Sequence, residues 1–334
     1  MEKDEAERTE KISYLDEKEE RLDKLLSEKL NLSRSFVQKI IEQGLVSINN
    51  KVVSKKSEKI KKGDIIEVKI PREKKIKIEK SDLPIEILYE DEDYLVLNKP
   101  AGIVVHPSGE YKKDTIVNII LDKIEFEVED EASEISLKKG QIRPGIVHRL
   151  DREVSGVLIV AKNQKSASKA SEAFKERKVK KVYLALCFGK TEKKEWIIKK
   201  TIGRSRGEKI MRISEKGKSA ETIVKKIISD DQRKLTLFQV EPITGRTHQI
   251  RVHLSSEGFP IVKDEMYGGG GQKLEKLKKQ IGEKFFEHEG IFLHALSIEI
   301  FGKKFVAPLP WYFEGIIKSL WGELPPTISE VLKS

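Results

Sequence analysis

The sequence predicts a protein of mixed helices and strands in two domains, and three observations lead to this prediction. The chain has 334 residues, which is long enough for more than one hydrophobic core. Apolar residues recur first at helical intervals and then, from Ile85 onward, in short β-branched runs separated by turn residues. Between the two patterns lies a lysine-rich segment bounded by prolines, so residues 71–84 are predicted to form a linker.

The composition indicates a basic protein of the cytoplasm. Charged residues make up 36% of the chain and the net charge is +10, which favours a polyanionic partner. No apolar run approaches the ~18 residues that cross a bilayer, so we expect no membrane partner. The first seven residues are mostly charged and cannot act as an apolar signal core. A single cysteine, Cys187, forbids an internal disulfide and fits a reducing compartment.

The first 45 or so residues change from an acidic to a basic, helical pattern. Residues 1–20 carry nine acids against four bases and show no apolar period, so we expect a loose leader there. The charge then reverses, with twelve Lys or Arg against six acids in residues 21–70. Leucines at helical spacing predict a first helix between residues 22 and 30. Ser33 as N-cap and Gly44 as stop signal delimit a second helix.

Short strands follow the second helix. Residues 46–48 and 51–53 are typical of a hairpin with a two-residue turn. A turn at Gly63-Asp64 leads into a third short strand. Two helices followed by a few strands, with an excess of positive charge, fit a small RNA-binding module.

Residues 21–70 resemble the ribosomal-protein-S-four-like (alpha-L) RNA-binding domain. The resemblance rests on Arg21-Leu-Asp-Lys-Leu-Leu26, Ser33-Arg-Ser35, Gly44 to Asn49 and Gly63-Asp64. It implies contacts to RNA phosphates, which would position the chain on RNA without reading its sequence. The candidate RNA-binding residues are Arg34, Lys39, Lys51 and Lys55. The alternative is a small domain whose lysines only solvate it.

The second domain is predicted over residues 85–325. Within it, residues 166–179 have helical spacing and residues 182–188 form a strongly apolar strand. Residues 122–141 hold seven acids against three bases, so we expect an inserted surface loop there. The glycine run 268–271 predicts a flexible joint before a lysine-rich helix.

Asp151 is the candidate catalytic acid. It lies between Arg149 and Arg152, at a break between the apolar runs 146–147 and 157–161. A carboxylate at the end of a strand points into a cleft, and the flanking guanidinium groups favour its ionised form. Taken in isolation, the same pattern also fits a surface ion pair worth ~0–1 kcal/mol.

Three further segments carry residues that could act beside this acid. Residues 97–108 alternate strand and turn signals, and residues 181–185 place Tyr183 on a strand. Residues 241–258 predict a turn and then a helix that is capped by Thr247 and stopped by Gly258. On that helix His248 and Arg251 share one face near the positively polarised N-terminus.

Together these motifs resemble the RluA-type pseudouridine synthases, and the basic front end resembles that of the members that modify ribosomal RNA. The resemblance rests on His148-Arg-Leu-Asp151 with Ser155-Gly156, Gly245 to His253, and Leu97-Asn-Lys-Pro100. It covers about residues 85–315. It implies an α+β fold in which a mixed, mainly antiparallel sheet with flanking helices forms the catalytic domain.

The resemblance also implies a role for each site residue. Asp151 is held against the target nucleoside, and three roles stay open for it: attack on the sugar, attack on the base, or removal of a sugar proton. Arg251 pairs with Asp151, and Tyr183 stacks on the uracil. Arg149 helps to displace the nucleotide from its stack. The other candidates for substrate binding are His148, Arg246 and His248.

The implied isomerisation of uridine to pseudouridine needs no redox change, no phosphate donor and no metal, so we expect no cofactor. The sequence has no clustered Cys/His set for a metal. Gly217-Lys-Ser219 superficially suggests a phosphate loop, but Arg212 stands where its first glycine should be, so no nucleotide cofactor is expected.

Several alternatives remain open at this point. The expected substrate is large-subunit ribosomal RNA, and transfer RNA is a second candidate because related catalytic domains act on it. A non-catalytic RNA-binding or ribosome-assembly factor would share the scaffold but should lack the set of Asp151, Tyr183 and Arg251. A methyltransferase or hydrolase should instead show a cofactor loop or metal ligands. The chain is expected to be a monomer.

Overall fold

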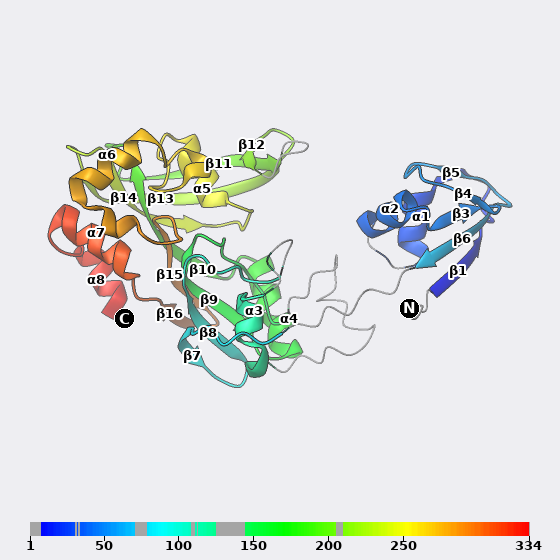
Figure 1. Cartoon of the computed structure of the whole chain (residues 1–334), viewed down its shortest axis with the longest axis horizontal. Coiled ribbons are helices and arrows are strands. Elements are labelled where there is room, and N and C mark those ends of the chain that lie inside the picture. Colours follow the sequence, from blue (N-terminus) through cyan, green and yellow to red (C-terminus); the bar gives the residue numbers. More distant parts are fainter. Residues whose placement is uncertain are drawn as a thin grey trace. The chain divides into compact units, whose positions relative to one another are not determined.

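The structure, a computed structural model, describes residues 8–30, 32, 34–70, 79–107, 111, 113–124, 144–204 and 210–333. Its internal contacts divide the chain into two compact units (Figure 1). The first unit holds the described residues up to residue 70, and the second holds those from residue 79. Each unit has its own hydrophobic core. In the part of the chain that is described, no helix is both long and apolar enough to span a bilayer.

The first unit packs two helices against small antiparallel sheets. One sheet has the strand order β1-β6-β3-β4, and a second pairs β2 with β5. Leu22, Leu26, Ile40 and Ile41 from the helices meet Ile66 and Val68 from the sheet in a fully buried core. The elements are β1 (Arg8–Ser13), β2 (Glu20–Arg21), α1 (Leu22–Lys29), α2 (Arg34–Glu42), β3 (Val46–Ile48), β4 (Lys51–Val52), β5 (Lys59–Ile60) and β6 (Ile65–Ile70).

Both predicted helices and the hairpin are present. Asn49 and Asn50 form the two-residue turn with φ of 50° and 65°, as a hairpin turn of this length requires. The predicted N-cap Ser33 lies outside the described residues.

The prediction of a loose leader over residues 1–20 is wrong from residue 8 onward. Residues 8–13 form β1, which pairs along its whole length with β6, from Arg8 opposite Ile70 to Ser13 opposite Ile65. Tyr14 is 5% exposed, and its hydroxyl donates a hydrogen bond to the carbonyl of Lys18. Backbone pairing to an open sheet edge stabilises this strand, and such pairing needs no apolar period. Residues 1–7 lie outside the described chain.

The second unit is built on one large sheet. Its strand order is β12-β11-β13-β14-β10-β15-β9-β8-β7, and β16 pairs with β15 beside this path. Among the pairs between the named strands, β9 with β15 is parallel and the others are antiparallel. The strands are β7 (Glu86–Glu90), β8 (Tyr94–Lys99), β9 (Ser155–Ala161), β10 (Lys180–Phe188), β11 (Glu195–Arg204), β12 (Met211–Ile213), β13 (Lys218–Asp230), β14 (Leu235–Pro242), β15 (Leu293–Ile300) and β16 (Lys303–Val306).

Clusters of apolar side chains lie on both faces of this sheet, and helices pack beside it (Figure 1). Alternate residues of β9 enter different cores: Leu158 and Val160 join the larger cluster, whereas Val157 and Ile159 join a smaller one with Ala170 of α4. Side chains of a strand alternate between its two faces, and here both faces are covered. The whole strand is therefore buried, and its sequence is a continuous apolar run. The helices are α3 (Ile116–Ile119), α4 (Gln164–Lys175), α5 (Gln249–Ser256), α6 (Gln272–Ile281), α7 (Trp311–Trp321) and α8 (Pro326–Lys333), with 3₁₀ turns at Leu121–Lys123, Glu265–Tyr267 and Glu283–Phe286.

The α+β class and the mainly antiparallel catalytic sheet are therefore confirmed. Two local predictions in this unit are wrong. The catalytic domain does not end at residue 325, because α8 follows and buries Ile328 in the main core. The glycine run is not a loose joint: the backbone of Gly269 bonds to Lys263 and Asp264, and a Cβ there would lie 1.7 Å from the carbonyl oxygen of Ile261. Most of the acidic segment 122–141 lies outside the described residues.

Candidate active site

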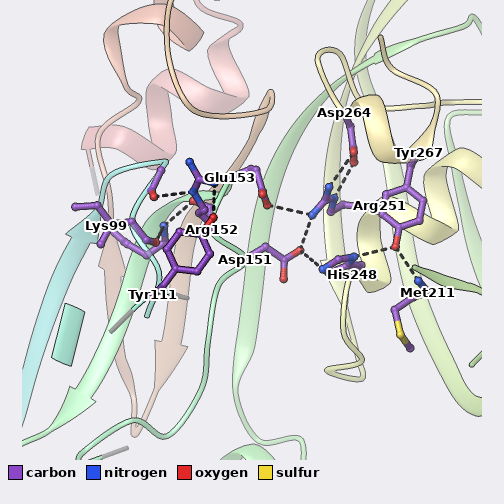
Figure 2. A network of polar contacts seen from close by, with 12 residues as sticks. Lys99, Tyr111, Asp151, Arg152, Glu153, Met211, His248, Arg251, Asp264 and Tyr267 are labelled. Carbon is purple, nitrogen blue, oxygen red and sulfur yellow. Dashed lines mark hydrogen bonds and ion pairs between the residues drawn. The ribbon is translucent and has the colours of Figure 1, made fainter. Parts of the chain in front are cut away.

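Asp151 lies in the turn that leads into β9, and its carboxylate faces α5 (Figure 2). The turn is closed by a hydrogen bond from the amide of Val154 to the carbonyl of Asp151. The Asp151 side chain is 17% exposed, so it is accessible yet largely shielded from water. Its Oδ2 lies 3.3 Å from Nη1 of Arg251 and 3.9 Å from Nε2 of His248.

Arg251 is the cation of the site, and α5 presents it from inside the unit. Its side chain is only 3% exposed. Two parallel hydrogen bonds join its Nε and Nη2 to the carboxylate of Asp264, at 2.8 and 2.9 Å. Its Nη1 is left for two acids of the turn before β9, Asp151 and Glu153, each at 3.3 Å. Asp264 thus fixes the plane of the guanidinium while the third nitrogen meets the catalytic candidate.

The charge state of Arg251 follows from these contacts. Burial alone would lower its pKa, but the hydrogen bonds and charge of Asp264, followed by the charges of Asp151 and Glu153, raise that pKa above its usual value. Arg251 is therefore a permanent cation beside the shielded carboxylate of Asp151.

Tyr183 lies on β10, opposite Val240 of β14 and Ala295 of β15. Burial raises the pKa of its phenol, and the negative charge of Asp151 raises it further. The phenol therefore stays protonated at neutral pH and lies within electrostatic reach of Asp151. The structure brings together Asp151, Arg251 and Tyr183, which come from three separate parts of the sequence.

His248 lies between the carboxylate of Asp151 and the hydroxyl of Tyr267 (Figure 2). His248 is the residue before α5 and has a left-handed backbone, with φ of 54°. Its Nδ1 lies 2.8 Å from the hydroxyl of Tyr267, and that hydroxyl accepts a hydrogen bond from the amide of Met211 at 3.2 Å. The predicted cap Thr247 is wrong: α5 begins at Gln249 with His248 in the N-cap position, which makes no side-chain capping bond.

Lys99 fixes the turn that carries Asp151. It is completely buried, and its ammonium donates to the carbonyls of Pro100, Ile103 and Arg152, at 2.8, 2.9 and 3.2 Å. Burial lowers the pKa of Lys99 to about 7, against the opposing charges of Asp151 and Glu153. Three carbonyl acceptors match the three N–H donors of the protonated amine.

Two of the remaining substrate-binding candidates, His148 and Arg246, bond to strands of the sheet instead of to Asp151. His148 accepts a hydrogen bond from the amide of Ile159 and stacks on Phe174 of α4. Burial lowers the pKa of His148 to about 3, so this ring is a neutral packing element of the sheet. Arg246 donates to the carbonyl of Ser219 on β13. Arg149 is exposed beside the turn that holds Asp151.

The four RNA-binding candidates lie on the surface of the first unit. Lys39, Lys51 and Lys55 are exposed. Arg34 is also exposed, but its guanidinium hydrogen bonds to the fully buried carboxylate of Asp23 at 3.0 and 3.4 Å. Arg34 therefore stabilises the helix pair in addition to any contact with RNA.

Sequence reasoning missed Asp264, Glu153, Tyr267 and Lys99 as parts of this site. Asp264 and Tyr267 lie just before the glycine run 268–271, in a segment whose sequence gave no sign of which partner each would meet. Glu153 follows Asp151 by two residues. This spacing gave no sign that both carboxylates would contact the guanidinium of Arg251. Among the residues that the structure describes, no cluster of three or more His, Cys, Asp or Glu could hold a metal ion.

Comparisons with known proteins identify the family of both domains. Residues 20–66 match the S4 domain, and residues 93–256 match RNA pseudouridylate synthase. An uncharacterized RNA pseudouridine synthase of Aquifex aeolicus (strain VF5) is 38% identical over 260 residues, which are 77% of this chain and 80% of the relative. Ribosomal large subunit pseudouridine synthase D of Borreliella burgdorferi is 35% identical over 240 residues, which are 70% of this chain and 68% of the relative.

Solved structures point the same way. The human protein RNA Pseudouridylate Synthase Domain Containing 1 aligns with a TM-score of 0.54 at 25% identity, over 76% of this chain and 97% of that chain. An S4 domain thus precedes a catalytic domain of known type, in the order that the motifs predict. The chain belongs to the RNA pseudouridine synthases, the enzymes that isomerise uridine in RNA to pseudouridine.

Proposed function

We propose that this enzyme converts specific uridines of large-subunit ribosomal RNA to pseudouridine and that Asp151 is its catalytic carboxylate. The observation that carries the proposal is the contact of Asp151 with Arg251, 3.3 Å away and almost completely buried. A guanidinium that is itself fixed by Asp264 cannot turn away from the acid. The carboxylate is therefore oriented before the nucleotide arrives.

The reaction breaks the bond between N1 of uracil and C1′ of ribose, turns the base, and joins C1′ to C5. An ionised Asp151 serves any of three steps: attack on the sugar, attack on the base, or removal of a sugar proton. Tyr183 supplies a protonated phenol within electrostatic reach of the acid, and its ring is a surface on which the uracil stacks. Arg149 is exposed beside the turn that holds Asp151, where a cation would help to hold the nucleotide outside its stack.

Two findings support ribosomal RNA as the substrate. One relative that is similar over 70% of this chain is named as a large-subunit pseudouridine synthase. The S4 domain adds a basic surface that would hold a structured RNA while the second domain acts on one nucleotide. Two other relatives are named chloroplastic, so the cytoplasmic location stays a prediction.

The substrate is tested by mapping pseudouridine in the RNA of cells that have the enzyme and of cells that lack it. We expect discrete large-subunit sites to disappear on deletion and to return when the wild-type enzyme is supplied, but not when Asp151→Asn is supplied. Loss of sites from transfer RNA alone would contradict the ribosomal assignment and favour transfer RNA. Return of the sites with Asp151→Asn would contradict the role of this carboxylate.

The first domain is expected to supply part of the electrostatic attraction to RNA. Replacing the exposed Lys39, Lys51 and Lys55 by Gln should weaken binding and lower the slope of log affinity against log salt. Each lost phosphate contact changes that slope by ~0.7–0.9. Titrations of labelled ribosomal RNA fragments at several salt concentrations measure it.

A matched control removes the same charge from the second domain. Lys273, Lys276 and Lys279 are exposed on α6, and their replacement by Gln gives the same net charge. An equal change of slope in both triple variants would show that only total charge matters and would contradict a specific role of the first domain.

A further inference from the structure

The ring of His248 is held in one orientation between Tyr267 and Asp151 (Figure 2). The backbone of His248 is left-handed, a conformation that costs a residue other than glycine some free energy. The neighbouring loop is fixed by the buried amide of Gln249, whose oxygen accepts from the hydroxyl of Thr244 and from the amide of Arg246. Hydrogen bonds within the turn therefore hold the strained backbone of His248 in place, and this residue is not a frayed end of the helix.

The contacts with Tyr267 and Asp151 determine which ring nitrogen of His248 carries the proton. The amide of Met211 can only donate, so the oxygen of Tyr267 accepts from it at 3.2 Å. The carboxylate of Asp151 near Nε2 of His248 favours the ring proton on that nitrogen, so the phenolic proton of Tyr267 is donated to Nδ1, 2.8 Å away. Because Nδ1 accepts, the single proton of a neutral imidazole lies on Nε2, which faces Asp151.

The surroundings keep this imidazole neutral. Burial lowers the pKa of His248; among the charged neighbours Asp151, Glu153 and Asp264 raise it, and Arg251 lowers it. Tyr267, the other titratable group against the ring, also has a raised pKa, first because of burial, so it remains a phenol. At neutral pH the ring is therefore an uncharged donor directed at the acid.

A gap separates this donor from the acid. Nε2 of His248 and Oδ2 of Asp151 are 3.9 Å apart, which is too long for a hydrogen bond. A hydroxyl oxygen that lies about 2.8–3.0 Å from both atoms would fill the gap, accepting from Nε2 and donating to Oδ2. Within an RNA chain the 3′ and 5′ oxygens of ribose are esterified. The 2′-hydroxyl is the sugar group that can both donate and accept.

We propose that Asp151 and His248 together bind the 2′-hydroxyl of the target uridine, and that Tyr267 is a positioning residue that holds His248 as the donor. The inference rests on the proposed function, because it needs a uridine in RNA beside Asp151. It adds a recognition step: the pair distinguishes ribose from any sugar without that hydroxyl, and it fixes C1′ and C2′ next to the carboxylate.

The test compares three otherwise identical RNA substrates, with uridine, 2′-deoxyuridine or 2′-fluorouridine at a mapped target position. The 2′-fluoro sugar keeps the ribose-like pucker but cannot donate a hydrogen bond. Single-turnover rates are measured for the full-length enzyme and for the variants His248→Asn, Tyr267→Phe and Tyr89→Phe. Asn tolerates the left-handed backbone but is too short to reach the gap. The hydroxyl of Tyr89 on β7 bonds to Asp91 and serves as the matched control.

The wild-type enzyme should prefer uridine over both analogues by about 10- to 100-fold, because the analogues leave Nε2 and Oδ2 unpaired. In His248→Asn the rate on uridine should fall by about tenfold and the preference should shrink by a similar factor. Tyr267→Phe should shrink the preference less, and Tyr89→Phe should change neither the rate nor the preference.

Two results would overturn the inference. In the first, the wild-type enzyme converts the analogues as fast as uridine. In the second, His248→Asn slows all three substrates equally, as a merely structural residue would. Failure of the wild-type enzyme to convert any uridine in RNA would instead remove the proposed function, and with it this inference. The three outcomes are distinguishable in one set of measurements.

Discussion

Asp151→Asn should reduce pseudouridine formation by about 10⁴-fold while leaving the affinity for RNA within a few-fold. The amide nearly matches the carboxylate in size but carries no negative charge, so it can neither attack nor take a proton. Binding is expected to survive because the basic surface of the first domain is untouched. Single-turnover conversion of a mapped RNA fragment measures the first effect, and direct titration of the same fragment measures the second.

Glu153→Gln is the matched control for this variant. Glu153 lies at the same 3.3 Å from Nη1 of Arg251, yet it is 34% exposed whereas Asp151 is 17% exposed. Its replacement removes one of two similar ion pairs and leaves the proposed catalytic carboxylate in place. We expect an effect on rate of less than about tenfold. An Asp151→Asn enzyme that retains a rate similar to that of Glu153→Gln would refute the assignment of Asp151.

Arg251→Gln should both inactivate the enzyme and destabilise its second unit, by about 3–5 kcal/mol. The change leaves the carboxylate of Asp264, which is 1% exposed, without its two charged hydrogen bonds. It also removes the cation beside Asp151. Urea unfolding followed by tryptophan fluorescence measures the loss of stability. Trp196, Trp311 and Trp321 are the three tryptophans of the chain and all lie in the second unit, so the signal reports on this unit alone.

Two further variants serve as comparisons for the stability and the rate of Arg251→Gln. Arg251→Lys keeps the positive charge but not the paired geometry with Asp264, so it should fall between the wild-type enzyme and Arg251→Gln in both stability and rate. Arg233→Gln breaks a more exposed pair with Asp230 in the turn between β13 and β14, and it should cost about 1 kcal/mol or less. Equal losses of stability in Arg233→Gln and Arg251→Gln would contradict the structural role of the buried pair.

The parts of the structure that could be predicted are those that local patterns or contiguous motifs encode. The helices α1 and α2 follow the spacing of Leu22, Leu26 and Ile40, and the hairpin follows from two asparagines that accept positive φ. The motifs around Asp151, Tyr183 and Arg251 named three residues that the fold then brings together. Sequence could name them without geometry because each lies in its own recognisable segment.

The rest depends on contacts between distant segments. The strand β1 has an acidic, irregular sequence and exists because the edge of β6 offers hydrogen bonds to it. Asp264 became a site residue because a tight turn places it against α5. His148 belongs to the same motif as Asp151, but its ring packs on Phe174 and bonds to β9. Which way a side chain points at the end of a strand is determined by its neighbours in the sheet.

The contact between Asp151 and Arg251 joins residues that are 100 positions apart in the chain. During synthesis the acid therefore leaves the ribosome well before its cation, after the S4 domain has already been made. For that interval the growing polypeptide contains the S4 domain but lacks the cation that contacts Asp151. The proposed site is therefore complete only after α5 has been made and has packed beside the acid.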